Sequence, residues 1–275
     1  MLITRRHLSP CLFLITGIVI AGQLSADECA DWTTAHPEWI WCDSFESDAP
    51  LSARYERVSI NGLGRSTVDA IDGGASLQQT YTPGQVNASW IVKSKPSGFP
   101  NPVFYRWYHK FDHGYTHFPP KMARAGHRRQ DTRRTAVFMV HSWIAGTHPT
   151  LDTRAENSGQ TTTNWLPVAK SSFDLSEHLG QWISYEVEIK LNSPGNADGH
   201  YRLWIDNHLA IERTGVDLRG NTVDKINEIM LDTYWNAGAP SHLLRFYDGF
   251  VISTKKIGPL QTPAVTPLPS SKPQR

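Results

Sequence analysis

Residues 180–199 read GQWISYEVEIKLNSPGNADG, and this stretch decides the fold class. Apolar and charged residues alternate in it, with Tyr185, Val187 and Ile189 set against Glu186, Glu188 and Lys190. Successive side chains of a β-strand point to opposite faces, so the alternation predicts a strand over 182–191 with one buried face. The Pro194-Gly195 and Asp198-Gly199 pairs favour a reversal of the chain, which predicts a hairpin with a second strand over 201–205.

Period-two runs bounded by turn-forming residues recur along the chain, whereas helical periodicity is scarce. The clearest further runs are 103–111, 136–143, 226–235 and 244–253, and weaker ones lie at 55–60, 75–81 and 88–92. A short helix-like segment spans 174–179. This organisation predicts an all-β fold, an antiparallel β-sandwich or jelly roll.

The two ends of the chain differ in composition from its middle. Arg5 and Arg6 precede an apolar run over 8–21, and small residues at 24–26 offer a cleavage site. This order predicts a signal peptide over 1–26, although an uncleaved anchor is the alternative. A single domain is then expected over 27–258 and a Pro-rich disordered tail over 259–275. The expected location is secreted or periplasmic.

The mature chain keeps two cysteines, Cys29 and Cys42. In an oxidising compartment they would form one disulfide, with two free thiols as the alternative. The formal net charge of +1 identifies no partner by itself, while ten Trp and nine Tyr could fill a core or line a groove for sugars. No stable membrane insertion after signal cleavage is expected.

The hairpin region, together with Leu203-Trp204-Ile205-Asp206, resembles the concanavalin A-like polysaccharide lyases, a group that includes alginate and glucuronan lyases. Three further segments fit the resemblance, which covers most of residues 40–258: Cys42–Glu46 as an opening strand, Tyr105–Phe111 as a central groove strand, and Tyr247–Ser253 with Ile257-Gly258 as a closing strand. Pro119-Pro120-Lys121 stands where the family has a Gly-rich, lysine-containing loop. The resemblance implies a concanavalin A-like jelly roll that cleaves an acidic, uronate-containing polysaccharide by β-elimination in a concave groove.

Such a reaction has three requirements: the uronate carboxylate is neutralised, the C5 proton is removed and the leaving oxygen is protonated. Arg, Lys or protonated His suits the first task, and Tyr, His or Lys suits the others. No redox cofactor is required. His141, on the strand over 136–143, is the first candidate for proton transfer, and Tyr234 is the second. The alternatives are a hydrogen-bonded core or groove role for His141 and ordinary aromatic packing for Tyr234.

The candidate substrate-binding residues are cationic, aromatic or acidic: Arg106, Tyr108, Lys110, Lys121, Trp143, Glu188 and Trp235. Arg106 and Lys110 share a strand face and could bind carboxylates, or they could form ion pairs with Glu186 and Glu188. Trp143 and Trp235 could stack on sugar rings or fill the core. The basic stretch 121–134 is expected to be a loop, either attracting a polyanion or simply solvated. Nucleic acid is not the expected partner, because the protein is predicted to be exported.

No metal site is assigned. Asp43, Glu46 and Asp248 are oxygen donors that could serve a structural calcium, which needs six to eight oxygens. Two other function classes remain open. One is a non-catalytic, lectin-like carbohydrate-binding domain. The other is a glycoside hydrolase that uses Glu186 and Glu188, although Lys190 stands where sandwich glycosidases carry a third acid.

Overall fold

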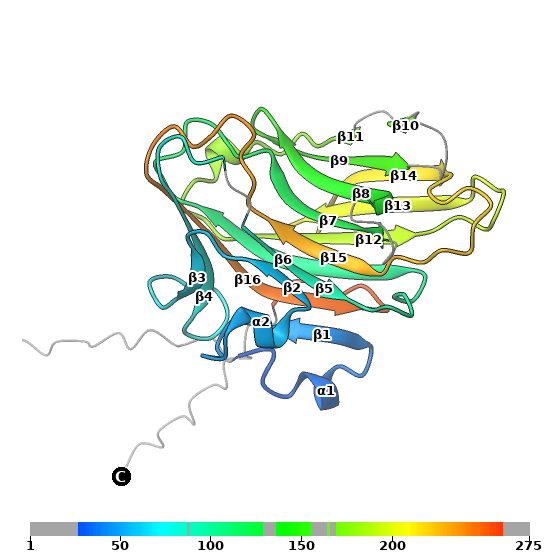
Figure 1. The fold of residues 1–275 in the computed structure, drawn as a ribbon, viewed down its shortest axis with the longest axis horizontal. Coiled ribbons are helices and arrows are strands. Elements are labelled where there is room, and N and C mark those ends of the chain that lie inside the picture. Colours follow the sequence, from blue (N-terminus) through cyan, green and yellow to red (C-terminus); the bar gives the residue numbers. More distant parts are fainter. Residues whose placement is uncertain (1–26, 87–88, 129–135, 156–163, 166–168, 261–275) are drawn as a thin grey trace, which may run out of the picture.

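The computed structural model describes residues 27–86, 89–128, 136–155, 164–165 and 169–260. It consists of two antiparallel β-sheets packed face to face, with very short helices at the periphery (Figure 1). The helices are α1 (Trp32–Ala35), α2 (Leu51–Arg54) and the 3-10 helix η1 (Leu175–Glu177). The prediction of an all-β sandwich is confirmed, and the expected helix-like segment over 174–179 contains η1.

Sheet A holds the hairpin from which the fold class was predicted. Its strands, in spatial order, are β14 (His208–Val216), β13 (Gly199–Ile205), β12 (Ile183–Lys190), β6 (Val103–Phe111), β16 (Leu243–Ser253), β4 (Ser76–Tyr81) and β3 (Leu63–Ser66), with β1 (Trp39–Asp43) also pairing with β16. β12 and β13 pair antiparallel with Lys190 opposite His200, so the chain reverses between them as expected.

Sheet B holds two of the clearest predicted strands, over 136–143 and 226–235, together with strands whose sequence pattern is weaker. Its strands, in spatial order, are β10 (Asn164–Trp165), β9 (His148–Ala155), β8 (Ala136–Ala145), β7 (Lys121–Arg128), β15 (Glu228–Asp232), β5 (Trp90–Ser94) and β2 (Arg57–Ser59), with β11 (Ala169–Lys170) also pairing with β9. The expectation of a basic loop over 121–134 is wrong for its first eight residues, because they form β7 in the middle of this sheet. Residues 129–134 lie outside the described part.

The core fills the space between the sheets and is rich in aromatic rings. Trp107 lies between Tyr105 and Tyr185 in a stack, with ring centroids 5.7 and 5.4 Å apart. Tyr185, Val187 and Ile189 are all fully buried in this core, as their alternation predicts. Large buried aromatic side chains each contribute several kcal/mol of hydrophobic free energy, so this layer fixes how the two sheets lie against each other.

The N-terminal segment is joined to sheet A by the Cys29–Cys42 disulfide, which confirms the expected pairing. Cys42 belongs to β1, and its Cα lies 5.4 Å from that of Cys29. A disulfide fits an oxidising compartment such as the cell exterior. Within the part of the chain that the structure describes, no helix is long and apolar enough to cross a membrane. The predicted signal peptide lies outside this part.

Candidate active site

The outward-facing side chains of sheet B form a surface that we call the B face. On β8, Phe138, Val140 and Ile144 belong to the core between the sheets. The residues that alternate with them, His141 among them, therefore lie on the opposite side of the strand. The same alternation places Arg124 of β7, Asp152 of β9, Met230 of β15 and Arg57 of β2 on the B face, because their neighbours Ala123, Leu151, Ile229 and Val58 face the core.

The register of sheet B sets these side chains in one row. Arg124 is opposite His141, and His141 is opposite Asp152. On the other side of β7, Arg124 is opposite Met230, and the row continues through Val92 to Arg57. The row crosses six strands at right angles to their direction. Val92 and Met230 in this row are covered by neighbouring groups, whereas Arg57 and Arg124 are partly exposed.

A β-bulge brings Lys121 to the same surface. The register of β7 against β8 shifts between Lys121, opposite Trp143, and Ala123, opposite Ser142. Both Met122 and Ala123 are buried in the core. A bulge inserts one extra residue into a strand and so changes which face the following side chains occupy. Lys121 and Arg124 thereby end on the same side although three positions separate them.

His141 and Asp152 form a buried pair on the B face. The His141 Nδ1 atom lies 3.5 Å from the Asp152 Oδ1 atom, and both side chains are more than 90% buried. Burial lowers the pKa of His141, as does the charge of Lys121, while the Asp152 carboxylate opposes the shift. A carboxylate beside one ring nitrogen orients the imidazole and leaves Nε2 for proton transfer. His141 is thus neutral at pH 7 and suited to act as a base.

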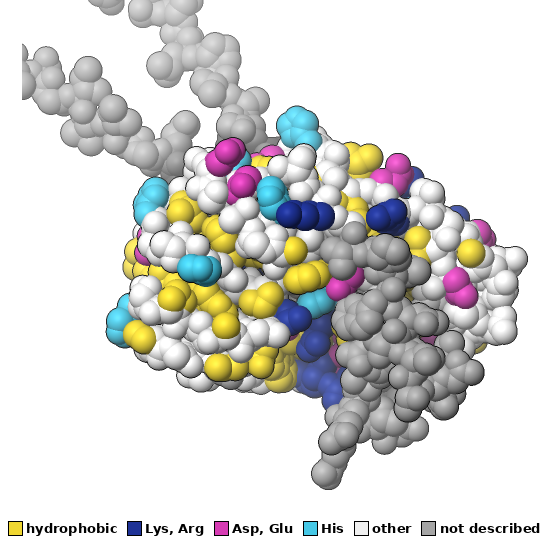
Figure 2. Space-filling model, turned by 90° about the horizontal axis from the view of Figure 1, so that it is seen from above, with side chains coloured by type: hydrophobic (Ala, Val, Ile, Leu, Met, Phe, Trp, Pro, Cys, Tyr) yellow, Lys and Arg dark blue, Asp and Glu magenta, His cyan; other side chains and the backbone are white. Residues whose placement is uncertain are grey.

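Lys121 completes a charged cluster around His141. Burial lowers the pKa of Lys121, the carboxylates of Asp232 and Asp152 oppose this, and Arg124 adds to it. The charges of the two acids and of Arg124 thus act on the Lys121 ammonium. In the space-filling view, Lys, Arg and His side chains gather in a hollow of the surface (Figure 2). A neutral His141 imidazole, oriented by the Asp152 carboxylate and lying beside the Lys121 and Arg124 cations, can accept a proton from an anionic ligand that the cations hold.

Asp232 is the last residue of β15, and Tyr234 follows two positions later. A polar network in the core fixes the backbone of this segment. The Tyr234 N–H donates to Asp232 Oδ1 at 3.0 Å. From the core side, Tyr247 donates its hydroxyl to the Asp232 carbonyl and Tyr81 donates to the Thr233 carbonyl. Tyr234 itself is half-buried. The core thus restrains the segment that carries the second proton-transfer candidate.

Arg245 lies beneath this segment and is fully buried. Its Nε atom lies 2.6 Å from His109 Nε2, and its guanidinium lies 4.8 Å from the centre of the Tyr247 ring. Arg245 also reaches the Tyr81 hydroxyl at 3.4 Å. Aromatic faces stabilise a buried cation electrostatically. Arg245 therefore supports the tyrosines that hold residues 232–234, and it does not belong to the B face.

The two candidate tryptophans occupy different environments. Trp143 is half-buried on the B face, opposite Lys121. Trp235 is 3% exposed and packs in the core, stacked on Tyr115 at 5.9 Å and edge-on to Tyr81. Trp143 thus lies on the same surface as His141 and is partly exposed. The substrate-binding role expected for Trp235 is replaced by core packing, since its ring is covered by protein.

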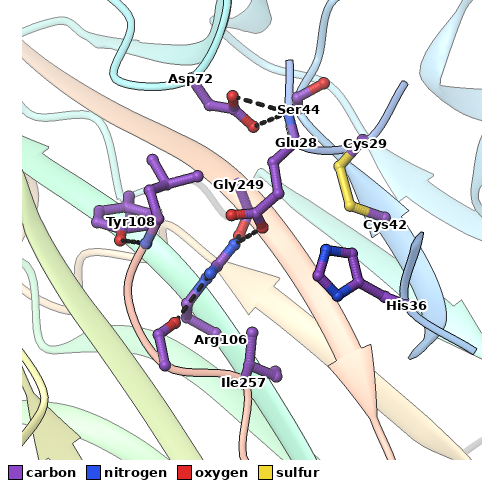
Figure 3. Close-up of polar contacts among 12 residues, drawn as sticks. Glu28, Cys29, His36, Cys42, Ser44, Asp72, Arg106, Tyr108, Gly249 and Ile257 are labelled. Atoms are coloured by element: carbon purple, nitrogen blue, oxygen red, sulfur yellow. Dashed lines mark hydrogen bonds and ion pairs between the residues drawn. A yellow bond between two sulfur atoms is a disulfide. The ribbon is translucent and has the colours of Figure 1, made fainter. Parts of the chain in front are cut away.

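Four other candidates lie on the outer face of sheet A, away from His141. Arg106 is 1% exposed, pairs with Glu28 and donates to the Gly258 carbonyl at 2.9 Å. The Tyr108 hydroxyl accepts a hydrogen bond from the Leu260 N–H at 2.7 Å. Figure 3 shows Arg106 directed at Glu28, next to the Cys29–Cys42 bridge. This part of the β6 face is therefore covered by the terminal segments of the domain.

Lys110 and the two glutamates of β12 are likewise engaged on sheet A. Lys110 pairs with Asp69. Glu188 pairs with His200 at 3.0 Å and with Arg202 at 2.9 Å, while Glu186 accepts the N–H groups of Ile257 and Gly258. The substrate-binding assignment of Arg106, Tyr108, Lys110 and Glu188 is thus replaced by structural roles. The glycoside hydrolase alternative depends on Glu186 and Glu188, and both carboxylates are engaged in these contacts.

The three candidate calcium ligands do not converge in the structure. Asp43 binds Arg54 and Tyr55, Glu46 accepts the N–H groups of Gly74 and Ala75, and Asp248 accepts those of Ile71, Asp72 and Gly249. Among the described residues, one group of potential ligand atoms comes together, at Asp27, Cys29 and Asp72. The Cys29 sulfur is already bonded in the disulfide, so this group offers two carboxylates, and calcium takes six to eight oxygens.

Four residues of the B face were not singled out as site residues in the sequence: Arg124, Asp152, Asp232 and Arg57. Strand register places Asp152 opposite His141 and Arg57 at the far end of the same row, and a single sequence does not reveal this register. A signal existed for Asp232, because it alternates with Tyr234. Arg124 could have been found from its spacing to Lys121 only with knowledge of the bulge.

Comparison with known families and structures identifies the type of protein that the chain resembles. Residues 145–242 match the family model described as Polysaccharide lyase 14. The resemblance to polysaccharide lyases is confirmed. The matched segment includes Asp152, Asp232 and Tyr234, together with the β12–β13 hairpin. No curated protein sequence matches the chain.

Solved structures share the fold at low identity. An endo-β-1,4-glucuronan lyase from the fungus Trichoderma reesei is similar at 14% identity and a TM-score of 0.56, covering 84% of this chain and 94% of its own. An alginate lyase from Aplysia kurodai is similar at 12% identity and a TM-score of 0.62, and the match covers 79% of this chain and 99% of the lyase. An alginate lyase from Chlorella virus is similar at 11% identity and a TM-score of 0.56, and the match covers 80% of this chain and 95% of the lyase. The family match and the shared jelly-roll fold together support a polysaccharide lyase.

Proposed function

We propose that this protein cleaves an acidic, uronate-containing polysaccharide by β-elimination on the B face. The observation that carries the proposal is the cluster of Lys121 and Arg124 beside the His141–Asp152 pair, all on one side of sheet B. The cations would neutralise the uronate carboxylate, which makes the C5 proton more acidic. His141, kept neutral by burial, would accept that proton through Nε2.

In this mechanism Tyr234 is the candidate acid that protonates the leaving oxygen. Tyr234 is half-buried, its backbone N–H donates to Asp232 Oδ1, and the Asp232 carboxylate affects the pKa of Lys121. The C5–H bond breaks as His141 takes the proton, the C4–O bond breaks, and a double bond forms between C4 and C5. The phenol of Tyr234 supplies the proton that the departing oxygen requires. Secretion after removal of residues 1–26 would bring the enzyme to its polymer.

The test is to incubate the domain over residues 27–260 with polyglucuronate, alginate and other polyuronates, and to follow the absorbance of the unsaturated product. We expect a rise with at least one polyuronate. His141→Ala and Tyr234→Phe should each abolish it while circular dichroism shows the fold intact. New reducing ends without that absorbance would indicate hydrolysis. Binding without any product would favour the lectin-like alternative.

A further inference from the structure

A second group of charged residues lines a pocket at the β2 side of the B face. The pocket has a volume of about 360 Å³ and is lined by Glu56, Arg57, Ser94, Pro96, Arg128, Asn227 and Glu228. A volume of this size lies within the range of small-molecule sites, and a single sugar ring fits in it. The pocket residues play no part in the proton transfers described above.

Strand register gives the separation of this pocket from His141. The row of outward residues runs from His141 on β8 through β7, β15 and β5 to Arg57 on β2. These are four steps between neighbouring strands, or about 19 Å at roughly 4.8 Å a step. A pyranose ring in an extended glycan advances by about one strand spacing, so Arg57 lies roughly four sugar residues from His141.

The lining carries both cationic and acidic side chains. Arg57 pairs with Glu228 at 2.6 Å, and its guanidinium lies 5.4 Å from the centre of the Trp90 ring. Burial lowers the pKa of Arg57, and the charges of Arg128 and Arg124 add to this shift against the opposing Glu228. The three guanidinium groups thus repel one another, while two carboxylates line the pocket: Glu228 is paired to Arg57, and Glu56 is paired to Lys93 at 3.0 Å. A uronate carboxylate would relieve the repulsion among the guanidinium groups.

We propose that this pocket is a distal uronate subsite, in which Arg57 and Arg128 bind the carboxylate of a sugar about four residues from the cleaved bond. The inference rests on the proposed function and extends it from one sugar to a chain. A glycan held at both ends of the row lies across β8, β7, β15, β5 and β2. The enzyme would then prefer long chains and cut inside them, because short oligomers cannot reach both sites.

The experiment compares a hexasaccharide with a trisaccharide prepared from the same polyuronate, using wild type, Arg57→Gln, Arg128→Gln and Glu228→Gln. Arg213→Gln is the matched control, because it removes the same charge from the exposed side of β14. For each protein the ratio of kcat/KM on the hexasaccharide to that on the trisaccharide is measured. Circular dichroism checks folding, and Arg128→Gln decides the result if Arg57→Gln does not fold.

We expect Arg57→Gln and Arg128→Gln to lower the ratio by at least about tenfold, since each loses a charge-assisted hydrogen bond to the distal sugar. Glu228→Gln should raise the ratio, because it frees Arg57 from its ion pair. A merely structural role for Arg57 would not give this opposite sign. A ratio equal to that of Arg213→Gln in both arginine variants overturns the subsite and leaves the lyase activity intact.

Calorimetric titration with the hexasaccharide separates this inference from the proposed function. If the wild type binds the hexasaccharide without cleaving it, the proposed reaction fails. The subsite is then decided by whether Arg57→Gln and Arg128→Gln weaken that binding by at least about tenfold. If the wild type does not bind the hexasaccharide, the subsite is refuted.

Discussion

Replacing Asp152 by Asn tests the pair that we place at the centre of the chemistry. The change removes one charge from the side chain that lies 3.5 Å from His141 Nδ1 and keeps nearly the same shape. When His141 accepts a proton, the imidazolium gains a favourable interaction with the Asp152 carboxylate. The asparagine cannot supply this interaction, so kcat should fall.

The size of the effect follows from the distance. Two unit charges at 3.5 Å attract by about 4.7 kcal/mol at an effective dielectric constant of 20, and by about 1.2 kcal/mol in bulk water. With roughly half of the proton transferred in the transition state, about 0.6–2.4 kcal/mol is lost, which corresponds to a fall in kcat of about 3- to 60-fold.

The pH dependence of the rate is a second, independent test of the interaction between Asp152 and His141. Activity requires neutral His141, so the rate falls as the pH drops through the pKa of this residue. Asp152 raises that pKa against the lowering effect of burial. Without its charge the acid limb of the kcat/KM profile should move to lower pH. The assay is the initial rate of unsaturated uronate formation across the acid range.

Asp48→Asn serves as the control, because the Asp48 side chain is 91% exposed and pairs only with Arg65 among the described ion pairs. It should leave both the rate and the pH profile unchanged. An Asp152→Asn enzyme with a wild-type kcat and an unmoved acid limb would show that the carboxylate does not act on His141. An acid limb that moved to higher pH would contradict the expected effect of the Asp152 charge, which raises the pKa of His141.

Three further predictions concern stability and binding. Replacing Cys29 and Cys42 by Ser should lower the free energy of unfolding by about 3 kcal/mol in urea titrations, because the bridge closes a loop across 13 sequence positions; an unchanged midpoint would contradict this. Trp235→Ala should lower the free energy of unfolding by about 3–5 kcal/mol through loss of core packing. Trp143→Ala should mainly raise KM. Equal melting temperatures for the two variants would contradict the core location of Trp235 and the surface location of Trp143. Burial raises the pKa of Asp72 to about 7 from an ordinary value near 4, so the folded state binds the proton more tightly than the unfolded state does. Stability should fall by roughly 1–3 kcal/mol as the pH rises from 4 to 7, and Asp72→Asn should abolish this component; the same slope in wild type and variant would refute it.

The strands of sheet A could be predicted because their faces differ strongly in polarity. In β6 and β12 the inward residues are aromatic or β-branched and the outward ones are mostly charged, so period two is evident. β7 could not be predicted in this way. Its sequence, KMARAGHR, is rich in small and basic residues, and the bulge at Lys121–Ala123 interrupts the alternation.

The candidate site was predictable in part, for a related reason. His141, Trp143 and Tyr234 became candidates because each has reactive or aromatic chemistry on or beside a strong strand, and Lys121 because it stands where the resemblance has a lysine-containing loop. Alternation tells which side of a strand a residue occupies, but not what covers that side. Arg106 was therefore assigned to a groove, although Glu28 and the segment after β16 cover it. That covering is a tertiary contact between residues far apart in sequence.

The central claim is that elimination occurs on the B face and not on the outer face of sheet A. The most direct measurement is the initial rate of unsaturated uronate formation by His141→Ala and by Lys110→Gln, both checked for folding and assayed beside the wild type. The claim predicts no turnover for His141→Ala and a rate within about twofold of wild type for Lys110→Gln. Full activity in the first variant and none in the second would contradict it.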